Sequence, residues 1–208
     1  MQWKGLLGRL RLYEWTDKLF DMLLLTILWM AGMLPVLTVG ASCSAFYDTF
    51  QKSVVKGEGY ILKTFADSYR DNLKYGAAGT VMLALAIFIL GTNIGIIMEF
   101  QRGDVRILGI GFYGILLALC FGFFAYFFTL ISRFRMKLGW IVKAAFYLEF
   151  RKPLHTAVLV AVIAADLFLF RISPVFLVVM PCISVYVIFR IMDPLMKTLY
   201  EPIQRIKH

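Results

Sequence analysis

Ionisable side chains are rare in the long apolar segments of this sequence, and they are the first place to look for chemistry because an unpaired charge in an apolar environment is costly. Asp48 is the strongest candidate, since Ser42 and neighbouring hydroxyl-bearing residues offer it hydrogen-bonding partners in a segment of small residues. A carboxylate in that setting can bind a cation or a proton and couple it to a solute. Gly40 and Ser42 indicate a second part of the same site: with Ser42 as the N-cap of a helix that begins at Cys43, backbone amides would face a ligand.

The other ionisable residues in or beside apolar segments have simpler explanations. Asp166 lies close enough to Arg171 in the sequence to be neutralised by it, and His155 stands at the start of an apolar segment, where a side chain reaches the interface. The motifs of zinc proteases, serine hydrolases, P-loop NTPases and dinucleotide-binding enzymes do not occur. The three cysteines lack a CxxC or Cys/His partner, so we interpret them as free, buried small apolar residues. We therefore predict no enzymatic activity, no catalytic residues, no cofactor and no metal site.

The elements that hold these residues are predicted to be membrane helices. Of the 208 residues, 61% are hydrophobic and only 17% are charged, a surplus of apolar side chains that a soluble domain of this size cannot bury. We interpret the net charge of +9 as cations at membrane interfaces and not as a nucleic-acid-binding surface. The prediction is an all-α fold, a polytopic membrane helix bundle in one domain over residues 1–208. The predicted spans are 19–34, 38–55, 75–98, 107–131, 154–170 and 174–192.

Segment 38–55 decides whether the chain has five or six spans. A helix from Ser42 to the end of this segment rises only about 20 Å, less than the roughly 30 Å of hydrocarbon in a bilayer. If the segment crosses, nearly all lysine and arginine residues gather on one side, and only Arg102, Arg106 and Arg171 remain outside. The positive-inside rule favours this arrangement, so we expect six helices in three hairpins with both termini in the cytoplasm. Five spans, with 38–55 as a re-entrant half-helix, is the alternative.

Two amphipathic stretches in the cytoplasmic loops are expected to lie on the membrane surface. Their apolar stripes consist of Ile61, Phe65, Tyr69 and Leu73 in the first stretch and of Trp140, Ala144, Tyr147 and Phe150 in the second. Aromatic residues flanked by lysine and arginine are typical of a helix that lies in the headgroup layer. A surface that receives a cytoplasmic partner protein is the alternative interpretation of these stretches.

The two stretches also resemble each other. Both contain a phenylalanine followed four residues later by an aromatic residue, an arginine and then a leucine, and in both this pattern stands just before a span. The pattern places Arg70 and Arg151 at equivalent positions, which indicates an internal duplication of the kind found in transporters. We therefore include Arg70 and Arg151 among the candidate functional residues, with Gly40, Ser42 and Asp48.

Two longer blocks of the sequence carry a family resemblance. The first contains LPVLTVGAS at 34–42 and AFY at 45–47, and the second contains VKGEGY at 55–60 and YRDNLK at 69–74. These blocks resemble the YesL-like family of bacterial membrane proteins, a domain of unknown function, and the SRF at 132–134 is similar to a later, weaker block of that family. The resemblance implies a multi-pass protein of the bacterial plasma membrane that is encoded beside carbohydrate uptake systems, commonly ABC importers. It implies no catalytic or binding residues.

These observations favour a non-enzymatic accessory or regulatory membrane protein associated with carbohydrate uptake of the ABC type. Its expected partners are the lipid bilayer, subunits of such an importer and further copies of itself, and no nucleic acid is expected. The alternative is a small oligomeric transporter or channel for a small solute, with Gly40, Ser42 and Asp48 as its coupling site. A membrane enzyme that acts on lipid or glycan would need an acid–base pair that the sequence does not offer.

Overall fold

The computed structural model of the protein describes residues 18, 20–100, 102–134, 136–173 and 176–206, with the backbone alone for 177–179 and 197–206. The described secondary structure is entirely helical, which confirms the predicted all-α class. In chain order the elements are the helix Phe20–Met33, η1 (Val36–Thr38), α2 (Val39–Thr49), the π-helical η2 (Phe50–Val55), α3 (Ile61–Phe100), α4 (Asp104–Arg133), α5 (Leu138–Arg151), α6 (Pro153–Ile172) and α7 (Phe176–Ile206). Both termini, whose cytoplasmic location was predicted, lie outside the described residues.

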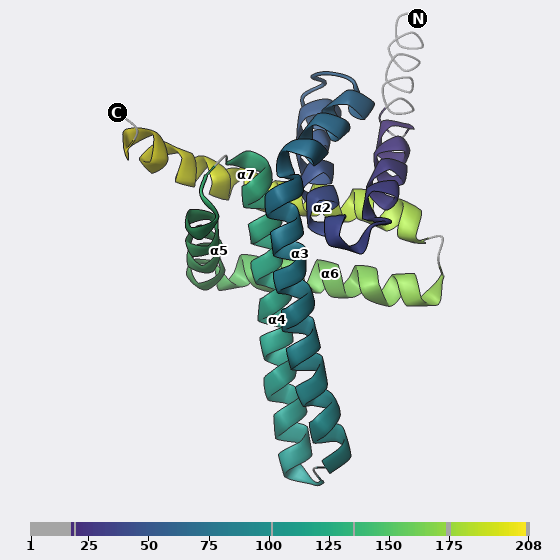
Figure 1. Ribbon diagram of the computed structural model, residues 1–208, viewed down its shortest axis with the longest axis vertical. Coiled ribbons are helices and arrows are strands. Elements are labelled where there is room, and N and C mark those ends of the chain that lie inside the picture. The colour runs from purple at the N-terminus through teal and green to yellow at the C-terminus, as the bar shows by residue number, and fades with distance from the viewer. Residues whose placement is uncertain (1–17, 19, 101, 135, 174–175, 207–208) are drawn as a thin grey trace, which may run out of the picture.

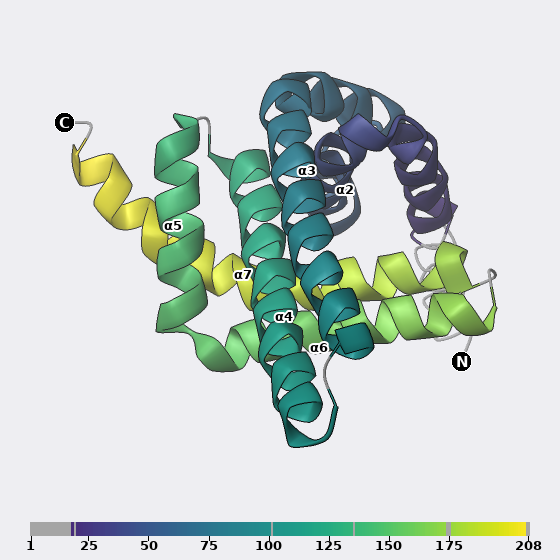
Figure 2. The ribbon, with the colours of Figure 1, turned by 60° about the horizontal axis from the view of Figure 1, so that its bottom comes forward.

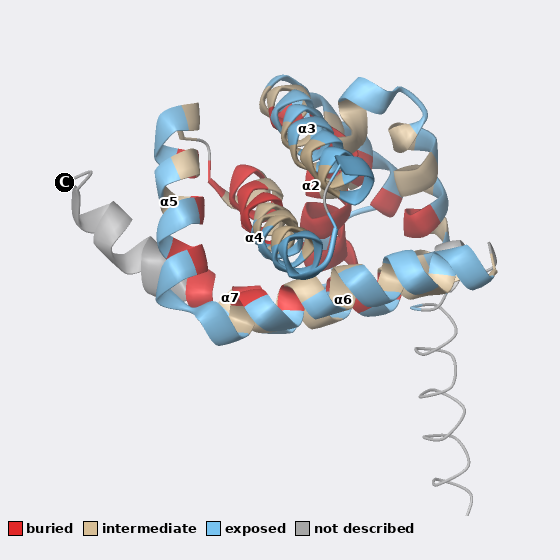
Figure 3. Ribbon diagram, turned by 90° about the horizontal axis from the view of Figure 1, so that it is seen from below, coloured by how far each residue is buried: buried red, intermediate tan, exposed pale blue. Residues whose placement is uncertain are grey.

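The longest feature of the fold is an antiparallel hairpin of α3 and α4, whose tip projects from the remaining helices (Figure 1). The chain turns at Gly103, which has a φ of 66°, in the left-handed region that favours glycine. Because α3 has 40 residues, it is about 60 Å long, roughly twice the hydrocarbon thickness of a bilayer. The half of the hairpin near its tip is exposed and apolar, as expected of helices that contact lipid (Figure 3).

Three of the described helices are long and apolar enough to cross a membrane, namely α3, α4 and α6. The helix Phe20–Met33 is apolar but shorter. The segment 39–55, formed by α2 and η2, is mostly buried inside the protein, so its irregular π-helical part is shielded from lipid. A membrane protein with an all-helical fold is therefore supported, while the count of five or six spans stays a prediction.

The pair α6 and α7 runs across the α3–α4 hairpin and not alongside it (Figures 1 and 2). The view along the hairpin shows α3 and α4 end-on and α6 lengthwise (Figure 3). The crossing of α4 and α6 is close because Gly122 has no side chain: a Cβ at this position would lie 2.8 Å from Cγ2 of Thr156. The hairpins thus do not form a set of parallel helices.

The core lies where α2 packs against α3 and the second half of α4. Its largest fully buried side chains include Phe50, Tyr126 and Phe127. Gly40 and Gly76 bring α2 and α3 into backbone contact, since a Cβ on Gly76 would lie 2.4 Å from the backbone nitrogen of Ala41. The small residues of segment 38–55 therefore serve close helix packing, as their types predict.

The two predicted surface stretches differ in structure. Residues 61–74 do not form a separate helix but are the first turns of α3, whereas α5 is a separate helix that ends before Pro153. The repeat pattern aligns Pro153 of the second stretch with Asn72 of the first. Proline lacks the N–H that a continuous helix needs, and Lys152 before it is non-helical, with φ −128° and ψ 63°. The second stretch therefore ends as a separate helix. The aromatic stripe of α5 is exposed, as predicted for a helix at a membrane surface, while Ile141 and its neighbours at helical spacing pack on α4.

Candidate polar pocket at the base of the hairpin

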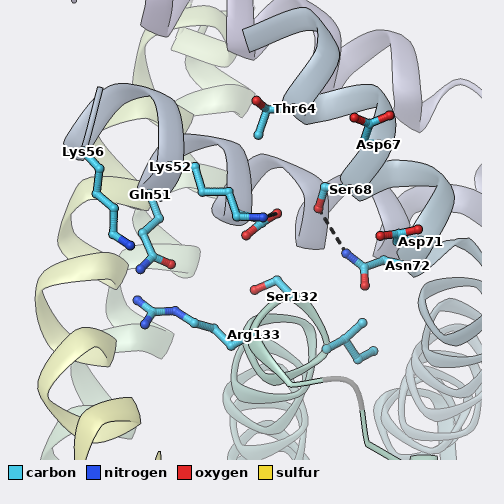
Figure 4. A pocket seen from close by; sticks show the side chains of 12 residues that line it. Gln51, Lys52, Lys56, Thr64, Asp67, Ser68, Asp71, Asn72, Ser132 and Arg133 are labelled. Atoms are coloured by element: carbon cyan, nitrogen blue, oxygen red, sulfur yellow. Dashed lines mark hydrogen bonds and ion pairs between the residues drawn. The ribbon is translucent and has the colours of Figure 1, made fainter. Parts of the chain in front are cut away.

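A half-open pocket of about 630 Å³ lies at the end of the α3–α4 hairpin opposite its tip (Figure 4). This volume is typical of sites for small ligands. The lining, which we call the polar pocket, consists of Asp48, Gln51, Lys52, Lys56, Thr64, Asp67, Ser68, Asp71, Asn72, Ile131, Ser132 and Arg133. Apart from Ile131, all of these side chains are polar or charged, so the pocket is suited to a hydrophilic ligand.

Three local features of the sequence place these side chains around one space. The residues of α3 that line the pocket are three or four apart, so they share one helix face. The loop after η2 reverses the chain at Gly57 and Gly59, whose φ angles of 71° and 79° favour glycine. This reversal sets η2, with Lys52, opposite α3. The last residues of α4, ending at Arg133, close the third side.

The charges of the pocket are partly paired within the protein. Nζ of Lys52 lies 2.8 Å from a carboxylate oxygen of Asp48, whose side chain is only 8% exposed against 50% for Lys52. Nη2 of Arg133 lies 3.0 Å from a carboxylate oxygen of Asp193 in α7, and its guanidinium stands 5.8 Å from the ring centroid of Tyr47. The Nε of Arg133 is buried, so it is the outer part of the guanidinium that lines the pocket.

Of the five candidate residues that the sequence offered, Asp48 lines the pocket and the others do not. Its partner is Lys52 and not the neighbouring hydroxyl groups. Arg70 is exposed on α3 outside the pocket. Arg151 lies on α5, where its guanidinium stands 5.3 Å from the ring centroid of Tyr147 and donates a hydrogen bond to the hydroxyl of that residue. The structure therefore does not bring Arg70 and Arg151 together with Asp48.

The predicted ligand-facing helix start at Gly40 and Ser42 is wrong. The 3-10 turn η1 leads directly into α2, which begins at Val39, so Ser42 lies inside the helix and donates its hydroxyl to the carbonyl oxygen of Trp29 at 2.8 Å. The amide of Gly40 donates to Oγ1 of Thr80 at 2.8 Å. The amide of Gly40 is thus satisfied by α3, because the small residues let the two helices meet.

Two further sequence interpretations need correction. The described partner of Asp166 is the hydroxyl of Ser184 in α7, 2.7 Å away, and not Arg171. Among the cysteines, all free as predicted, only Cys182 is buried, and it forms a hydrogen bond with Thr26 at 2.9 Å.

The residues that sequence reasoning missed are those whose role depends on what they face. Arg133 ends a long apolar segment, a position where a cation usually contacts lipid headgroups, so nothing in the sequence separates it from other interfacial cations. Glu149 of α5 is only 4% exposed, and its Oε1 has no hydrogen-bond partner. Burial raises the pKa of this carboxyl from 4.5 to about 7. Within the described residues, no group of three or more His, Cys, Asp or Glu side chains is placed to hold a metal ion.

Residues 22–94 match the model of a family described as "Protein of unknown function, DUF624". No curated protein and no solved structure matches the chain. The matched stretch contains α2, η2 and most of α3, and it therefore supplies all of the polar pocket except the three residues from α4. The stretch that is similar to this family thus carries most of the candidate site.

Proposed function

We propose that the protein is a non-enzymatic accessory or regulatory membrane protein of an ABC-type carbohydrate importer, and that the polar pocket is its regulatory binding site. One observation carries this proposal: the pocket is hydrophilic and of ligand size, and it ends on a filled apolar core. Ile131 lies in its wall, and the fully buried Phe127 and Leu130 stand in the preceding turn of α4. A protein of this build binds a solute at one surface and does not conduct it through its own interior.

The link to carbohydrate import comes from the resemblance of segments 34–47 and 55–74 to the YesL-like family. The match of residues 22–94 to a family of unknown function is compatible with that assignment. The apolar hairpin would hold the protein in the plasma membrane beside an importer. The exposed aromatic and basic face of α5, with Lys143 5.7 Å from the ring centroid of Trp140, would lie at the headgroup layer.

Co-purification tests the association. The tagged full-length chain is isolated in mild detergent from its native membrane, and the recovered proteins are identified by mass spectrometry. We expect permease subunits of a carbohydrate ABC importer in near-equal amounts to the tagged chain. Recovery of the tagged chain with no importer subunit would reject the association.

Importer regulation has a separate test with matched variants. Lys56→Gln alters the pocket, and Lys63→Gln alters an exposed lysine of α3 outside it. We expect the first variant to change sugar uptake by the importer at an unchanged amount of protein, and the second to leave uptake as in the native chain. Equal uptake by both variants would exclude the pocket as the regulatory site.

The predicted orientation can be measured in the same cells. In a background without the native cysteines, single cysteines replace Lys63, Lys137 and Arg102, which lie at the base and at the tip of the hairpin. We propose that the base is cytoplasmic, so an impermeant thiol reagent should label only the tip from outside. Labelling of the base from outside would reverse the orientation.

The alternative function, an oligomeric transporter or channel, would need a path between copies of the chain, since the core of the single chain is filled. Flux of a small solute through vesicles that contain only this protein tests it. A flux that is abolished by Asp48→Asn would favour the alternative over the accessory function, and an absence of flux is expected.

A further inference from the structure

The two walls of the polar pocket carry opposite charge. The cations come from one side, where η2 and the loop after it supply Lys52 and Lys56 and α4 supplies Arg133. The carboxylates of Asp67 and Asp71 come from the facing side, on α3. Figure 4 shows Lys56, Gln51 and Arg133 directed toward one another, with the two α3 carboxylates at the opposite end of the pocket.

Among the described residues, each wall holds a charged side chain that forms no ion pair. Lys52 is paired with Asp48 and Arg133 with Asp193, but neither Lys56 nor Asp67 forms an ion pair among the described residues. The guanidinium of Arg133 also lines the cationic side. The lining holds equal numbers of basic and acidic residues, so a ligand that carries both an anionic and a cationic group gains more from the pocket than a ligand with charge of one sign.

We propose that the polar pocket binds a small zwitterion, a molecule with a phosphate or carboxylate group at one end and a primary ammonium group at the other. The anionic end accepts hydrogen bonds from Lys56 and Gln51 and lies beside the guanidinium of Arg133. The ammonium end donates to Asp67, and the hydroxyl of Ser68 lies on the same face of α3. This inference rests on the proposed function only in taking the pocket as a binding site.

Two sources can supply this chemistry. The pocket begins where the apolar part of α4 ends, at Ile131. A bilayer around the apolar hairpin would therefore place the pocket beside lipid headgroups, and a zwitterionic headgroup such as phosphoethanolamine fits the charge pattern. A free solute of the same chemistry can enter from the water side, because the pocket is half-open. The shared feature is the anion–ammonium pair.

Calorimetric titration of the full-length chain in nanodiscs of phosphatidylglycerol tests the proposal, with phosphoethanolamine, inorganic phosphate and ethanolamine as probes. We expect phosphoethanolamine to bind at least tenfold more tightly than either fragment, because only it satisfies both walls. Lys56→Gln should weaken phosphoethanolamine and phosphate at least tenfold but leave ethanolamine unchanged, and Asp67→Asn should weaken phosphoethanolamine and ethanolamine but leave phosphate unchanged. A charge-assisted hydrogen bond accounts for losses of about 10- to 100-fold.

Lys63→Gln on α3 and Asp104→Asn at the tip of the hairpin are the matched controls, since both side chains are exposed outside the pocket. The proposal is overturned if phosphoethanolamine binds no more tightly than phosphate alone, or if the pocket variants match their controls. Repeating the titration in nanodiscs with phosphatidylethanolamine identifies the source: a weakened affinity assigns the pocket to the lipid headgroup, and an unchanged affinity assigns it to a free solute. If these titrations contradict the proposal while co-purification still recovers importer subunits, the zwitterionic ligand is rejected and the importer association is kept.

Discussion

Replacing Glu149 by glutamine is the most direct test of how this bundle is assembled. Glu149 lies on the face of α5 that packs on α4 and is only 4% exposed, with Oε1 unpartnered. A Cβ on Gly122 would lie 3.4 Å from this oxygen, so the glycine makes the room that the carboxyl occupies. Tyr126 and Cys120 of α4 are titratable groups close to it, and no charged group of the described residues offsets the effect of burial on its pKa. The carboxylate form is therefore buried without compensation.

The size of the effect follows from the pKa of the carboxyl. Folding raises the pKa of Glu149 from 4.5 to about 7, and each pKa unit corresponds to about 1.4 kcal/mol. Below the unfolded value both states are protonated and the pKa difference contributes nothing. As the pH rises from about 4.5 to 7 the unfolded state loses its proton first, so the native chain loses stability, in total about 3 kcal/mol, and above pH 7 this loss is complete.

Unfolding in mixed detergent micelles, followed by circular dichroism between pH 5 and pH 8, measures this effect. Glu149→Gln should remove most of the pH dependence and should exceed the native stability at pH 8 by up to about 3 kcal/mol. Glu99→Gln, which changes an exposed glutamate of α3, should follow the native pH profile. Equal pH profiles for the native chain and Glu149→Gln would refute the assignment of a buried, uncompensated carboxyl.

Two further predictions concern the contact between α2 and α3. Gly76→Ala should destabilise the chain by about 3 kcal/mol, because its Cβ would lie 2.4 Å from a backbone nitrogen of α2. Gly91→Ala changes a glycine of the same helix whose Cβ would have no neighbouring atom within 4 Å, so it should stabilise the chain by up to about 1 kcal/mol. Similar melting temperatures of the two variants in detergent would contradict both expectations. Thr80→Val should cost about 1–3 kcal/mol, because the buried amide of Gly40 loses its acceptor. Thr92→Val, at an exposed site of the same helix, should cost almost nothing in the same unfolding assay, and a loss equal to that of Thr80→Val would exclude this cause.

Local patterns in the sequence account for several features of the fold. The surplus of apolar residues predicts an all-helical membrane protein, and the structure contains three helices long and apolar enough to span a bilayer. Small residues in segment 38–55 predict close helix packing, and α2 meets α3 at Gly40 and Gly76. Pro153 explains why one of the two similar stretches is a separate helix while the other, with Asn72 at the aligned position, continues into α3. Each of these properties depends on residues close together in the chain.

The candidate site could not be predicted to the same extent. Asp48 was identifiable as a carboxylate among small residues. Its partner Lys52 was not, because the two side chains meet only when the backbone between them is helical and places them one turn apart. The role of Gly40 and Ser42 was misjudged because it depends on where α2 begins, and the turn η1 moves that start to Val39. A shift of a few residues changes which amides are free, and sequence patterns locate helix ends only to within a few residues.

The sequence by itself determined the apolar character of the helices, the helical class and the small residues at which helices can approach closely, because these follow from composition and from spacing within one segment. Tertiary structure alone decided that Arg133 joins Lys56 and Asp67 around one pocket, and that Glu149 is buried against Gly122. Such contacts join segments far apart in the chain, and they depend on how helices cross. The free energy of a charged side chain is set by the groups that surround it, and those groups are known only once the helices have packed.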